Sequence, residues 1–467
     1  PPLVLMASVM LYVLLFDNKT FWRIALEVFG GDILALSGII GALYFLNLAV
    51  FCIFSIPQLV KPFCVIVLML SSVTSYYMDN LGVFIDREMI QNVMVTTVTE
   101  SKHLITIGFL LHVATYGLLP SILVIMVKLK KYSAVVTFGV PVFASIICFG
   151  VCIALLAIDF KTYASVIRDR RDLMASYQPG APIVNSFRYA AMVGRTINAE
   201  VQPLGEDAIK GVNYFKEDKA ILTVLVVGET ARAQNFSLNG YDRETNPMLS
   251  RWPILNFENV SSCGTSTAVS LPCMFSSLSR KQYSFEAGIA QQNLLDVLKY
   301  AGFEVEWWEN NTGHKGIANR VKSRDFAGIT VPNFCRKGEC DDGIFLPALR
   351  TYAESITKDT VLVLHQIGSH GPAYHLRYPP ASERFTPACK EADFQLCSTE
   401  EIVNAYDNTI AYTDKVLSEI IGFLNAQDDL TTALVYVSDH GESLGEGGLY
   451  LHGAPYFLAP EYQTKVP

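Results

Sequence analysis

The chain has 467 residues, of which 51% are hydrophobic and 17% are charged, and its formal net charge is -8. This composition is too apolar for an ordinary soluble protein and too charged for a chain that lies wholly in a membrane, so we expect two parts. The negative charge argues against a nucleic-acid-binding protein, because such proteins need a basic surface. The first residue is proline and the last four, Thr464–Pro467, carry no tail signal, so we interpret both ends as trimmed.

Apolar residues are concentrated at the start of the chain. Four runs without formal charge are each near the roughly 20 residues that cross a bilayer core: Ile33–Ile56, Pro62–Met78, Leu104–Val127 and Tyr132–Ile158. Leu3–Phe16 is shorter, and we interpret it as the remains of a first span, because the basic leader of a signal peptide is not visible. The sequence therefore predicts a five-helix transmembrane domain over residues 1–158, with an outward loop at 79–103.

Lysines in the short loops predict the orientation of these spans. Lys61 follows the second predicted span, and Lys128, Lys130 and Lys131 follow the fourth. Positive charge of this kind marks cytoplasmic loops, so the large C-terminal part is expected to face outward.

The outward loop contains a polar stripe. Asn92, Thr96 and Glu100 recur at every fourth residue within Met89–Lys102, and a helix would align them on one face. This face could hold a polar lipid headgroup, or it could simply be solvated. After the last span, residues 159–220 are partly amphipathic, and we expect them to bridge the membrane and soluble parts.

Six cysteines follow residue 260 as three pairs of close neighbours: Cys263 and Cys273, Cys335 and Cys340, Cys389 and Cys397. Local, even pairing favours disulfides and therefore an oxidising compartment such as a periplasm. A zinc cluster is the alternative, but no CxxC spacing is present. Among the possible connectivities we expect the three adjacent pairs.

Residues 221–467 alternate predicted strands with predicted helices. The strand candidates are Ile221–Val227, Phe303–Trp308, Thr360–His365 and Thr432–Val437. The helix candidates are Thr267–Leu278, Asn293–Tyr300, Phe345–Ala353 and Thr399–Asn425, the last with a capping-box spacing at Ser398 and Glu401. This alternation predicts an α/β domain in which helices cover a mostly parallel sheet and the site lies at the carboxyl ends of the strands.

Residues that can bind a metal follow three of these strands. Glu229 ends the first, His370 follows the third, and Asp439 and His440 end the fourth. Carboxylates and neutral imidazoles are ligands that Zn²⁺ selects, and a divalent cation would neutralise carboxylates that meet at one sheet edge. The Asp-His pair alone is more simply interpreted as the N-terminus of a helix, but the three strand ends together favour a metal.

Hydroxyl groups stand at the start of the predicted helix at Thr267–Leu278, in Thr265-Ser266-Thr267. Free amides and the helix dipole favour an anion there, although Ser and Thr in such positions are often only caps. Next to a zinc ion, a hydroxyl becomes a strong nucleophile near neutral pH. The sequence therefore offers a metal and a nucleophile for phosphoryl chemistry.

Four longer motifs occur in order: VVGETARA at 226–233, SCGTSTAVSLPCMFS at 262–276, LHQIGSHGP at 364–372 and YVSDHGESLGEGGLYLHG at 436–453. Together they resemble the phosphoethanolamine transferases of Gram-negative bacteria that modify lipid A, including the mobile colistin-resistance enzymes. The resemblance covers almost the whole chain. It implies an alkaline-phosphatase-like (sulfatase-like) fold for residues 221–467, with the C-terminal end of that domain missing.

The resemblance also implies roles for individual residues. Glu229, Thr267, Asp439 and His440 match zinc ligands, and Thr267 also matches the nucleophile. His370 and His452 match histidines that contact the phosphoryl group, assist protonation of the leaving group or bind a second zinc ion. A headgroup-binding set is matched by Asn92, Thr96, Glu100, Thr312 and Lys315, and Thr312 stands where relatives often have serine.

The reaction that the resemblance implies has two steps. Thr267 takes phosphoethanolamine from phosphatidylethanolamine, releasing diacylglycerol, and then passes the group to a lipid A phosphate. One zinc ion is expected and a second is possible, with His370 or His452 moving protons. We expect a monomeric, multi-pass protein of the bacterial inner membrane with a periplasmic catalytic domain, whose product lowers surface negative charge and gives polymyxin and colistin resistance.

Other functions remain open at this point. The chain could transfer phosphoethanolamine or glycerophosphate to another surface glycan, act as a phosphatase, or be a catalytically dead membrane-bound binding protein. A sulfatase is disfavoured, because Cys263–Thr267 lacks the CxPxR pattern of that family. The complete set of implied zinc ligands argues against a dead enzyme.

Overall fold

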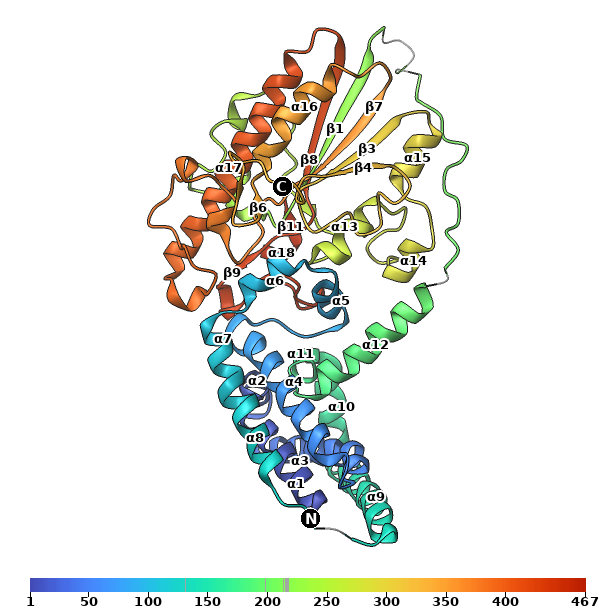
Figure 1. Ribbon diagram of the computed structural model, residues 1–467, viewed down its shortest axis with the longest axis vertical. Helices are drawn as coiled ribbons and strands as arrows, with labels where there is room; N and C mark the ends of the chain where they lie inside the picture. Colours follow the sequence, from blue (N-terminus) through green and yellow to red (C-terminus); the bar gives the residue numbers. More distant parts are fainter. Residues whose placement is uncertain (131, 198, 213, 215–217) are drawn as a thin grey trace. The chain divides into compact units, whose positions relative to one another are not determined.

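The computed structural model describes residues 1–130, 132–197, 199–212, 214 and 218–467, without the side chains of Thr99 and Glu100. These residues form two compact units (Figure 1). The helical unit comprises Pro1–Arg87 and Ile105–Arg188, and the sheet unit comprises Glu88–Leu104 and Tyr189–Pro467. Most of the outward loop therefore belongs to the sheet unit, and the bridging segment 159–220 is divided between the two units.

Four stretches of the helical unit, among the described residues, are long and apolar enough to cross a membrane. They are α3 (Ile33–Phe51) with η1 (Cys52–Phe54), α4 (Val60–Leu81), α7 (Ile107–His112) with η2 (Val113–Leu118) and α8 (Leu119–Met126), and α9 (Ala134–Ile158). The helices α1 (Pro2–Phe16) and α2 (Lys19–Phe29) form a pair bent by 71°, which makes a fifth span when the two are taken together. The prediction missed α2, because charged residues interrupt its apolar face.

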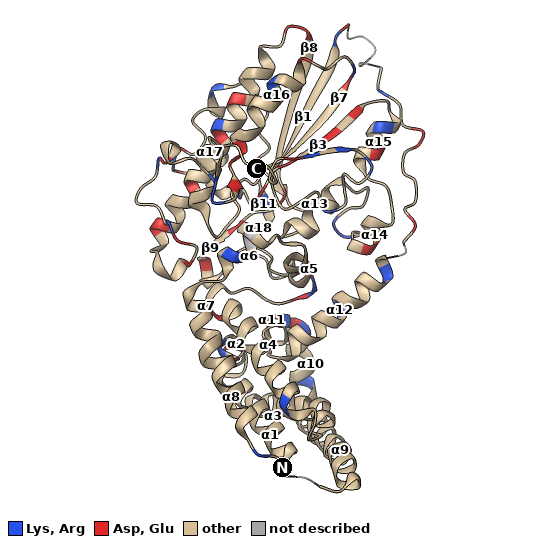
Figure 2. Ribbon diagram, viewed as in Figure 1, with Lys and Arg blue, Asp and Glu red and all other residues tan. Residues whose placement is uncertain are grey.

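The surface of the helical unit is apolar. On α9, Phe143 and Ile146 are 65% and 66% exposed, whereas Met6, Met10 and Val67 are buried inside the unit. Figure 2 shows few charged residues along α1, α3, α8 and α9. Apolar side chains on the outside are expected where the surrounding solvent is lipid rather than water.

Inside the helical unit, buried amide and hydroxyl groups from distant parts of the sequence form hydrogen bonds with one another. The Asn18 side chain donates to the Gln178 carbonyl (3.1 Å) and accepts from the Gln178 amide (2.8 Å), while the Thr74 hydroxyl donates to Gln178 Oε1 (2.8 Å). These bonds tie the start of α2 and the middle of α4 to the turn after α11. The helices after the last span are α10 (Phe160–Asp169), α11 (Arg171–Ala175) and α12 (Gly180–Thr196), of which α12 was not predicted.

The sheet unit is built on five parallel strands in the order β4-β3-β7-β1-β8. Their bounds are β1 (Ala220–Gly228), β3 (Glu304–Glu309), β4 (Lys322–Asp325), β7 (Thr360–His365) and β8 (Leu430–Ser438). The predicted parallel sheet and four of these strands are confirmed. The prediction missed β4, because this edge strand reads Lys-Ser-Arg-Asp and is exposed along its length.

Helices cover both faces of this sheet (Figure 1). Alternate strand residues, such as Val226 and Leu364, pack with α16 (Phe345–Ala353) and α17 (Thr399–Asn425). Their neighbours, Val227 and Val363, pack on the other face with α13 (Thr267–Phe275) and α15 (Leu294–Tyr300). The bounds predicted for α16 and α17 and the capping box of Ser398 with Glu401 are confirmed.

Short elements complete the sheet unit. The two-stranded pairs are β2 (Val260–Ser261) with β11 (Lys465–Val466), β5 (Cys335–Arg336) with β6 (Glu339–Cys340), and β9 (Ser443–Leu444) with β10 (Tyr450–Leu451). The short helices are α14 (Phe285–Ile289) and α18 (Glu461–Thr464). The three predicted disulfides are present, Cys263–Cys273, Cys335–Cys340 and Cys389–Cys397.

The outward loop does not form the single helix that the polar stripe predicted. It contains α5 (Arg87–Val95) and α6 (Val98–Leu104), which are separated at Thr96 and Thr97. The Thr96 hydroxyl donates to the Asn92 carbonyl (2.7 Å), and such local bonding by threonine competes with helix continuation. Asn92 therefore lies on α5 and Thr96 in the break, while the Glu100 side chain lies outside the described residues.

Candidate active site

Two neighbouring strands bring the predicted metal-binding residues together. Strands β1 and β8 pair in register up to Gly228 and Ser438, so Glu229 and the pair Asp439-His440 leave the sheet at the same level. The three side chains are fully buried, and one ligand atom from each lies within 4.8 Å of the others. His440 Nε2 is 3.3 Å from Glu229 Oε1 and 3.5 Å from Asp439 Oδ2.

Hydrogen bonds from the surrounding loop orient these groups. His440 Nδ1 donates to the Gly441 carbonyl (2.9 Å), which leaves Nε2 for a ligand. Asp439 Oδ1 accepts from the amides of His440 (2.7 Å) and Thr230 (3.2 Å). Thr230 has a φ of 60°, and a Cβ on Gly441 would collide with the Tyr462 carbonyl, so the backbone at both strand ends is tightly constrained.

The charge at this position fits a divalent cation. Among the described residues, the buried Asp439 Oδ2 has no hydrogen-bond partner. Burial, and to a smaller extent the neighbouring Glu229 carboxylate, raises the pKa of Asp439 to about 6. Burial alone would lower the pKa of His440, but the carboxylates of Asp439 and Glu229 raise the pKa of His440 to about 10. Two buried carboxylates and one imidazole, including an Asp439 oxygen that accepts no hydrogen bond from the described residues, form a donor set that suits Zn²⁺.

Thr267 lies directly beside this set. It is the first residue of α13, and its hydroxyl donates to Glu229 Oε2 at 2.8 Å and lies 3.4 Å from His440 Nε2. Ser266 occupies the N-cap position, so the Thr267 hydroxyl is directed at the carboxylate and not used as the cap. A phosphoryl group here would meet the free amides at the start of the helix.

Two further histidines lie at the same edge. The rings of His370 and His452 are 5.5 Å apart, and the rings of His440 and His452 are 4.5 Å apart. His452 Nδ1 donates to Glu442 Oε2 (2.9 Å), whose other oxygen accepts from the Tyr374 hydroxyl (2.6 Å). Sequence reasoning missed the fully buried Glu442, although its place on the loop between Asp439 and His452 was a usable signal.

The predicted headgroup residues are brought together only in part. Lys315 Nζ donates to the Thr312 hydroxyl (2.9 Å) and to the Val95 carbonyl at the end of α5 (3.3 Å). Lys315 is thus joined to both Thr312 and the segment that carries Asn92 and Thr96.

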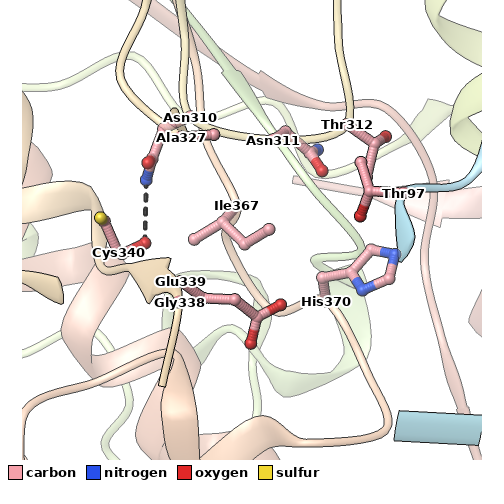
Figure 3. Close-up of a pocket in the computed structure, with 10 residues that line it drawn as sticks. All are labelled: Thr97, Asn310, Asn311, Thr312, Ala327, Gly338, Glu339, Cys340, Ile367 and His370. Carbon is pink, nitrogen blue, oxygen red and sulfur yellow. Dashed lines mark hydrogen bonds between the residues drawn. The ribbon is translucent and has the colours of Figure 1, made fainter. Parts of the chain in front are cut away.

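A cavity of about 100 Å³ adjoins His370, with Asn310, Asn311 and Thr312 among its lining residues (Figure 3). The Oδ1 atoms of Asn310 and Asn311 are buried and, within the described chain, have no hydrogen-bond partner. Their nitrogens are engaged, since Asn310 Nδ2 donates to Asp342 (2.8 Å) and Asn311 Nδ2 to Glu229 Oε2 (2.7 Å). The amide of Asn311 therefore connects a residue of the cavity wall to the candidate metal site.

A second buried pair supports Asn311. His365 Nε2 lies 3.2 Å from Asn311 Nδ2, and His365 Nδ1 donates to Glu309 at 2.9 Å. Burial lowers the pKa of His365, but Glu309 raises it above the ordinary value. His365 is therefore a buried, hydrogen-bonded residue at the end of β7.

Comparisons with known proteins agree with this geometry. Residues 222–467 match the Sulfatase family model, and residues 43–192 match the model for Phosphoethanolamine transferase EptA/EptB. The chain is similar to Phosphoethanolamine transferase EptA of Escherichia coli K12, with 40% identity over 412 residues that cover 87% of this chain and 75% of that relative. It is also similar to Phosphatidylethanolamine transferase Mcr-2 of Escherichia coli, with 35% identity over 487 residues, 100% of this chain and 89% of the relative.

A solved structure is similar over nearly the whole length. The integral membrane lipooligosaccharide phosphoethanolamine transferase A from Neisseria meningitidis superimposes with a TM-score of 0.94 and 36% sequence identity. The match covers 99% of this chain and 87% of that chain. Both units therefore have counterparts in one known membrane protein.

Proposed function

The chain belongs to the phosphoethanolamine transferase family, and we propose that it transfers phosphoethanolamine from phosphatidylethanolamine to a lipid A phosphate. The observation that carries this proposal is the Thr267 hydroxyl, held 2.8 Å from Glu229 within the buried set of Glu229, Asp439 and His440. We further propose that the helical unit lies in the bacterial inner membrane and the sheet unit in the periplasm. The apolar spans, the lysine-bearing loops and the three disulfides support this placement.

Glu229, Asp439 and His440, together with Thr267, would hold Zn²⁺. When bound, the ion would lower the pKa of the adjacent hydroxyl and polarise a phosphoryl oxygen. A second ion, if one binds, would take the region of His370 and His452, where imidazole groups and the Glu442 carboxylate gather. All of these residues come from one chain, so the proposed functional unit is a monomer.

In the proposed first half-reaction, Thr267 Oγ1 forms a bond to the phosphorus of the donor lipid. The hydroxyl proton passes to His370 or His452, and the bond from phosphorus to the glycerol oxygen breaks. Because Nδ1 of His452 donates to Glu442, its Nε2 is the nitrogen that exchanges a proton, and this nitrogen or His370 protonates the departing diacylglycerol. In the second half, a lipid A phosphate oxygen attacks the phosphothreonine ester and Thr267 regains its proton.

The cavity beside His370 supports ethanolamine as the group transferred. A primary ammonium has three donors and a positive charge, and the Glu339 carboxylate and the Thr312 side chain are among the polar groups of the residues that line the cavity. Choline, with three additional methyl groups and no N–H donor, fits this cavity poorly.

The proposal is tested by Thr267→Ala in the full chain. Labelled phosphatidylethanolamine should give a covalent phosphoethanolamine adduct on the wild type, detected by intact-protein mass spectrometry, and none on the variant. Turnover should fall by more than roughly 10³-fold, because removing a nucleophile removes the covalent route. Thr351→Ala, which removes an exposed hydroxyl from α16, is the matched control and should behave as wild type.

Lipid A from cells that express the wild type should gain phosphoethanolamine, and these cells should tolerate higher polymyxin concentrations, because the added ammonium lowers surface negative charge. An adduct on Thr267 without modified lipid A would point to another surface glycan as the acceptor. An adduct that persists in Thr267→Ala would exclude this nucleophile.

A further inference from the structure

A single carboxylate in the sheet unit contacts both an arginine and a histidine from distant segments. Glu339, on the short strand β6, lies 3.1 Å from His103 Nε2 and 3.2 Å from both terminal nitrogens of Arg377. The side chains of Glu339 and Arg377 are 11% and 1% exposed. Burial alone would raise the pKa of Glu339, but Arg377 and then His103 lower that pKa to about 2, so the carboxylate is charged at neutral pH.

The arginine side of this contact reaches His370. Arg377 Nε donates to the His370 carbonyl at 2.7 Å, while its two terminal nitrogens face the two oxygens of Glu339. The hydrogen bonds of Nε and of one terminal nitrogen therefore join the His370 carbonyl to the Glu339 carboxylate through one guanidinium group. Without Glu339, Arg377 would be a buried charge without its carboxylate, and it would turn or draw in water. The backbone of His370 would then lose a fixed support.

On its other side, Glu339 contacts the segment 88–104, here called the headgroup segment because it carries residues that the sequence predicts to bind the donor headgroup. His103 lies at the end of α6, in the same segment as Asn92 and Thr96. Other contacts of this segment go to loops of the site, since Gln91 Nε2 donates to the Ala268 carbonyl at 3.5 Å and Lys315 donates to the Val95 carbonyl. His103 holds the far end of the segment, beyond the break at Thr96.

The position of Glu339 is itself constrained. The β5–β6 hairpin is closed by the Cys335–Cys340 disulfide, directly beside Glu339. Glu339 also lines the cavity next to His370, opposite Asn311 and Thr312 in Figure 3. A crosslinked hairpin therefore presents one carboxylate to two separate parts of the site.

We infer that Glu339 is a positioning residue that aligns the two sides of the reaction. Through His103 it holds the segment 88–104 for binding of the donor headgroup, and through Arg377 it holds His370 for proton transfer. This inference rests on the proposed phosphoethanolamine transfer, in which His370 exchanges protons, and on the sequence prediction that Asn92 and Thr96 bind the donor headgroup.

The test separates KM from kcat for turnover of labelled phosphatidylethanolamine by the full chain in mixed micelles. His103→Asn should raise the donor KM by about tenfold with little change in kcat, because it loosens only the headgroup segment. Arg377→Lys should lower kcat by about tenfold with little change in KM, because lysine cannot bond two partners in one plane. Glu339→Gln should do both, and Glu339→Asp should recover part of each loss.

A double-mutant cycle sharpens the test. If His103 acts through Glu339, adding His103→Asn to Glu339→Gln should raise KM no further than Glu339→Gln alone. Glu304→Gln, which breaks an exposed ion pair with Lys358 (3.4 Å), is the control and should leave both constants unchanged. If Glu339→Gln does not fold, the inference is still tested by the other two variants. His103→Asn is then expected to change only KM, and the charge-conserving Arg377→Lys only kcat.

Wild-type activity distinguishes the two levels of the proposal. If the wild type does not turn over the labelled lipid, the proposed function fails. If the wild type is active and His103→Asn and Arg377→Lys keep wild-type KM and kcat, the positioning role of Glu339 is overturned. A uniform loss of folded protein with unchanged constants would likewise assign Glu339 a structural role only.

Discussion

Helices α9 and α13 show that the two units differ in where their apolar side chains lie. On α9, Phe143 and Ile146 are about two-thirds exposed, whereas every residue of α13 except Met274 is buried. The helical unit therefore presents apolar side chains outward and joins its buried amides and hydroxyls to one another, as at Asn18 and Gln178. The sheet unit buries its apolar residues on both faces of a sheet and gathers ionisable groups at one sheet edge.

This difference shows where chemistry can be placed. In the sheet unit, strand ends that lie side by side deliver Glu229, Asp439 and His440 to one point, so charges that would each be costly to bury compensate one another. An apolar exterior of the kind seen on α9 serves lipid contact instead. Three perturbations test this division, from the largest expected effect to the smallest.

Removal of metal should have the largest effect, and it should act on the sheet unit. Treatment of the full chain with a zinc chelator should lower phosphoethanolamine transfer by at least roughly 10²-fold, and Zn²⁺ should restore it, because the ion is proposed to activate the Thr267 hydroxyl. Asp439→Asn should lower both activity and bound zinc, measured by elemental mass spectrometry. Full activity after the metal content has fallen to background would contradict the proposed metal site.

A charge on the outer face of α9 should have the next largest effect. Phe143→Lys should disfavour membrane insertion by about 3 kcal/mol if the residue lies near the centre of the span, measured as the fraction of protein recovered in the membrane. Leu255→Lys, at a residue of the sheet unit that is 89% exposed, provides the matched control and should insert normally. Equal recovery of the two variants would show that α9 does not face lipid.

Acid should have the smallest effect and should act through ion pairs of the sheet unit. Burial alone raises the pKa of Asp296, but Arg320, at 2.6 and 2.7 Å, and the Asn293 amide lower that pKa below its ordinary value. A carboxyl group whose pKa is lower in the folded than in the unfolded state stabilises the fold above the unfolded-state pKa, which is about 4. This stabilisation is lost as the pH falls through the folded-state pKa. Acid should therefore remove the contribution of this pair.

Arg320→Gln isolates that contribution. The variant should be less stable than the wild type by about 1 kcal/mol or less at pH 7, and the difference should shrink between pH 5 and pH 2. The difference in stability is measured by thermal unfolding, followed by the fluorescence of Trp307 and Trp308, which are both buried in the sheet unit. A difference that grows towards acid pH would have the wrong sign for a depressed carboxyl pKa.

Local signals made much of the fold predictable. The buried runs of β1 and β7, the capping box of α17 and the close cysteine pairs are each contained in a few consecutive residues. The prediction of one helix across 89–102 was wrong. The four-residue spacing of polar groups gives no information about the hydrogen bond from the Thr96 hydroxyl to the Asn92 carbonyl, which competes with helix continuation.

The supporting residues of the site were harder to find for a different reason. Glu442, Asn311 and Glu339 act through partners that are 10, 82 and 236 residues away in the chain, at His452, Glu229 and His103. No local pattern marks the contacts of Asn311 and Glu339, whereas Glu442 stands on the loop between Asp439 and His452 and could have been found there. By contrast, Glu229, Asp439 and His440 stand directly at strand ends, where topology alone predicts that they meet.

The Cys263–Cys273 bridge closes a ring of chain that contains Thr267. The start of α13 is thereby tied to its own leading loop, whereas the ring closed by Cys389 and Cys397 encloses none of the proposed site residues. A reductant would open the ring that contains the proposed nucleophile by breaking the first bridge, and would open a ring without proposed site residues by breaking the last. Both cysteines of the first bridge and the proposed nucleophile thus lie within eleven consecutive residues, so the covalent closure of this short ring restricts the backbone that carries Thr267.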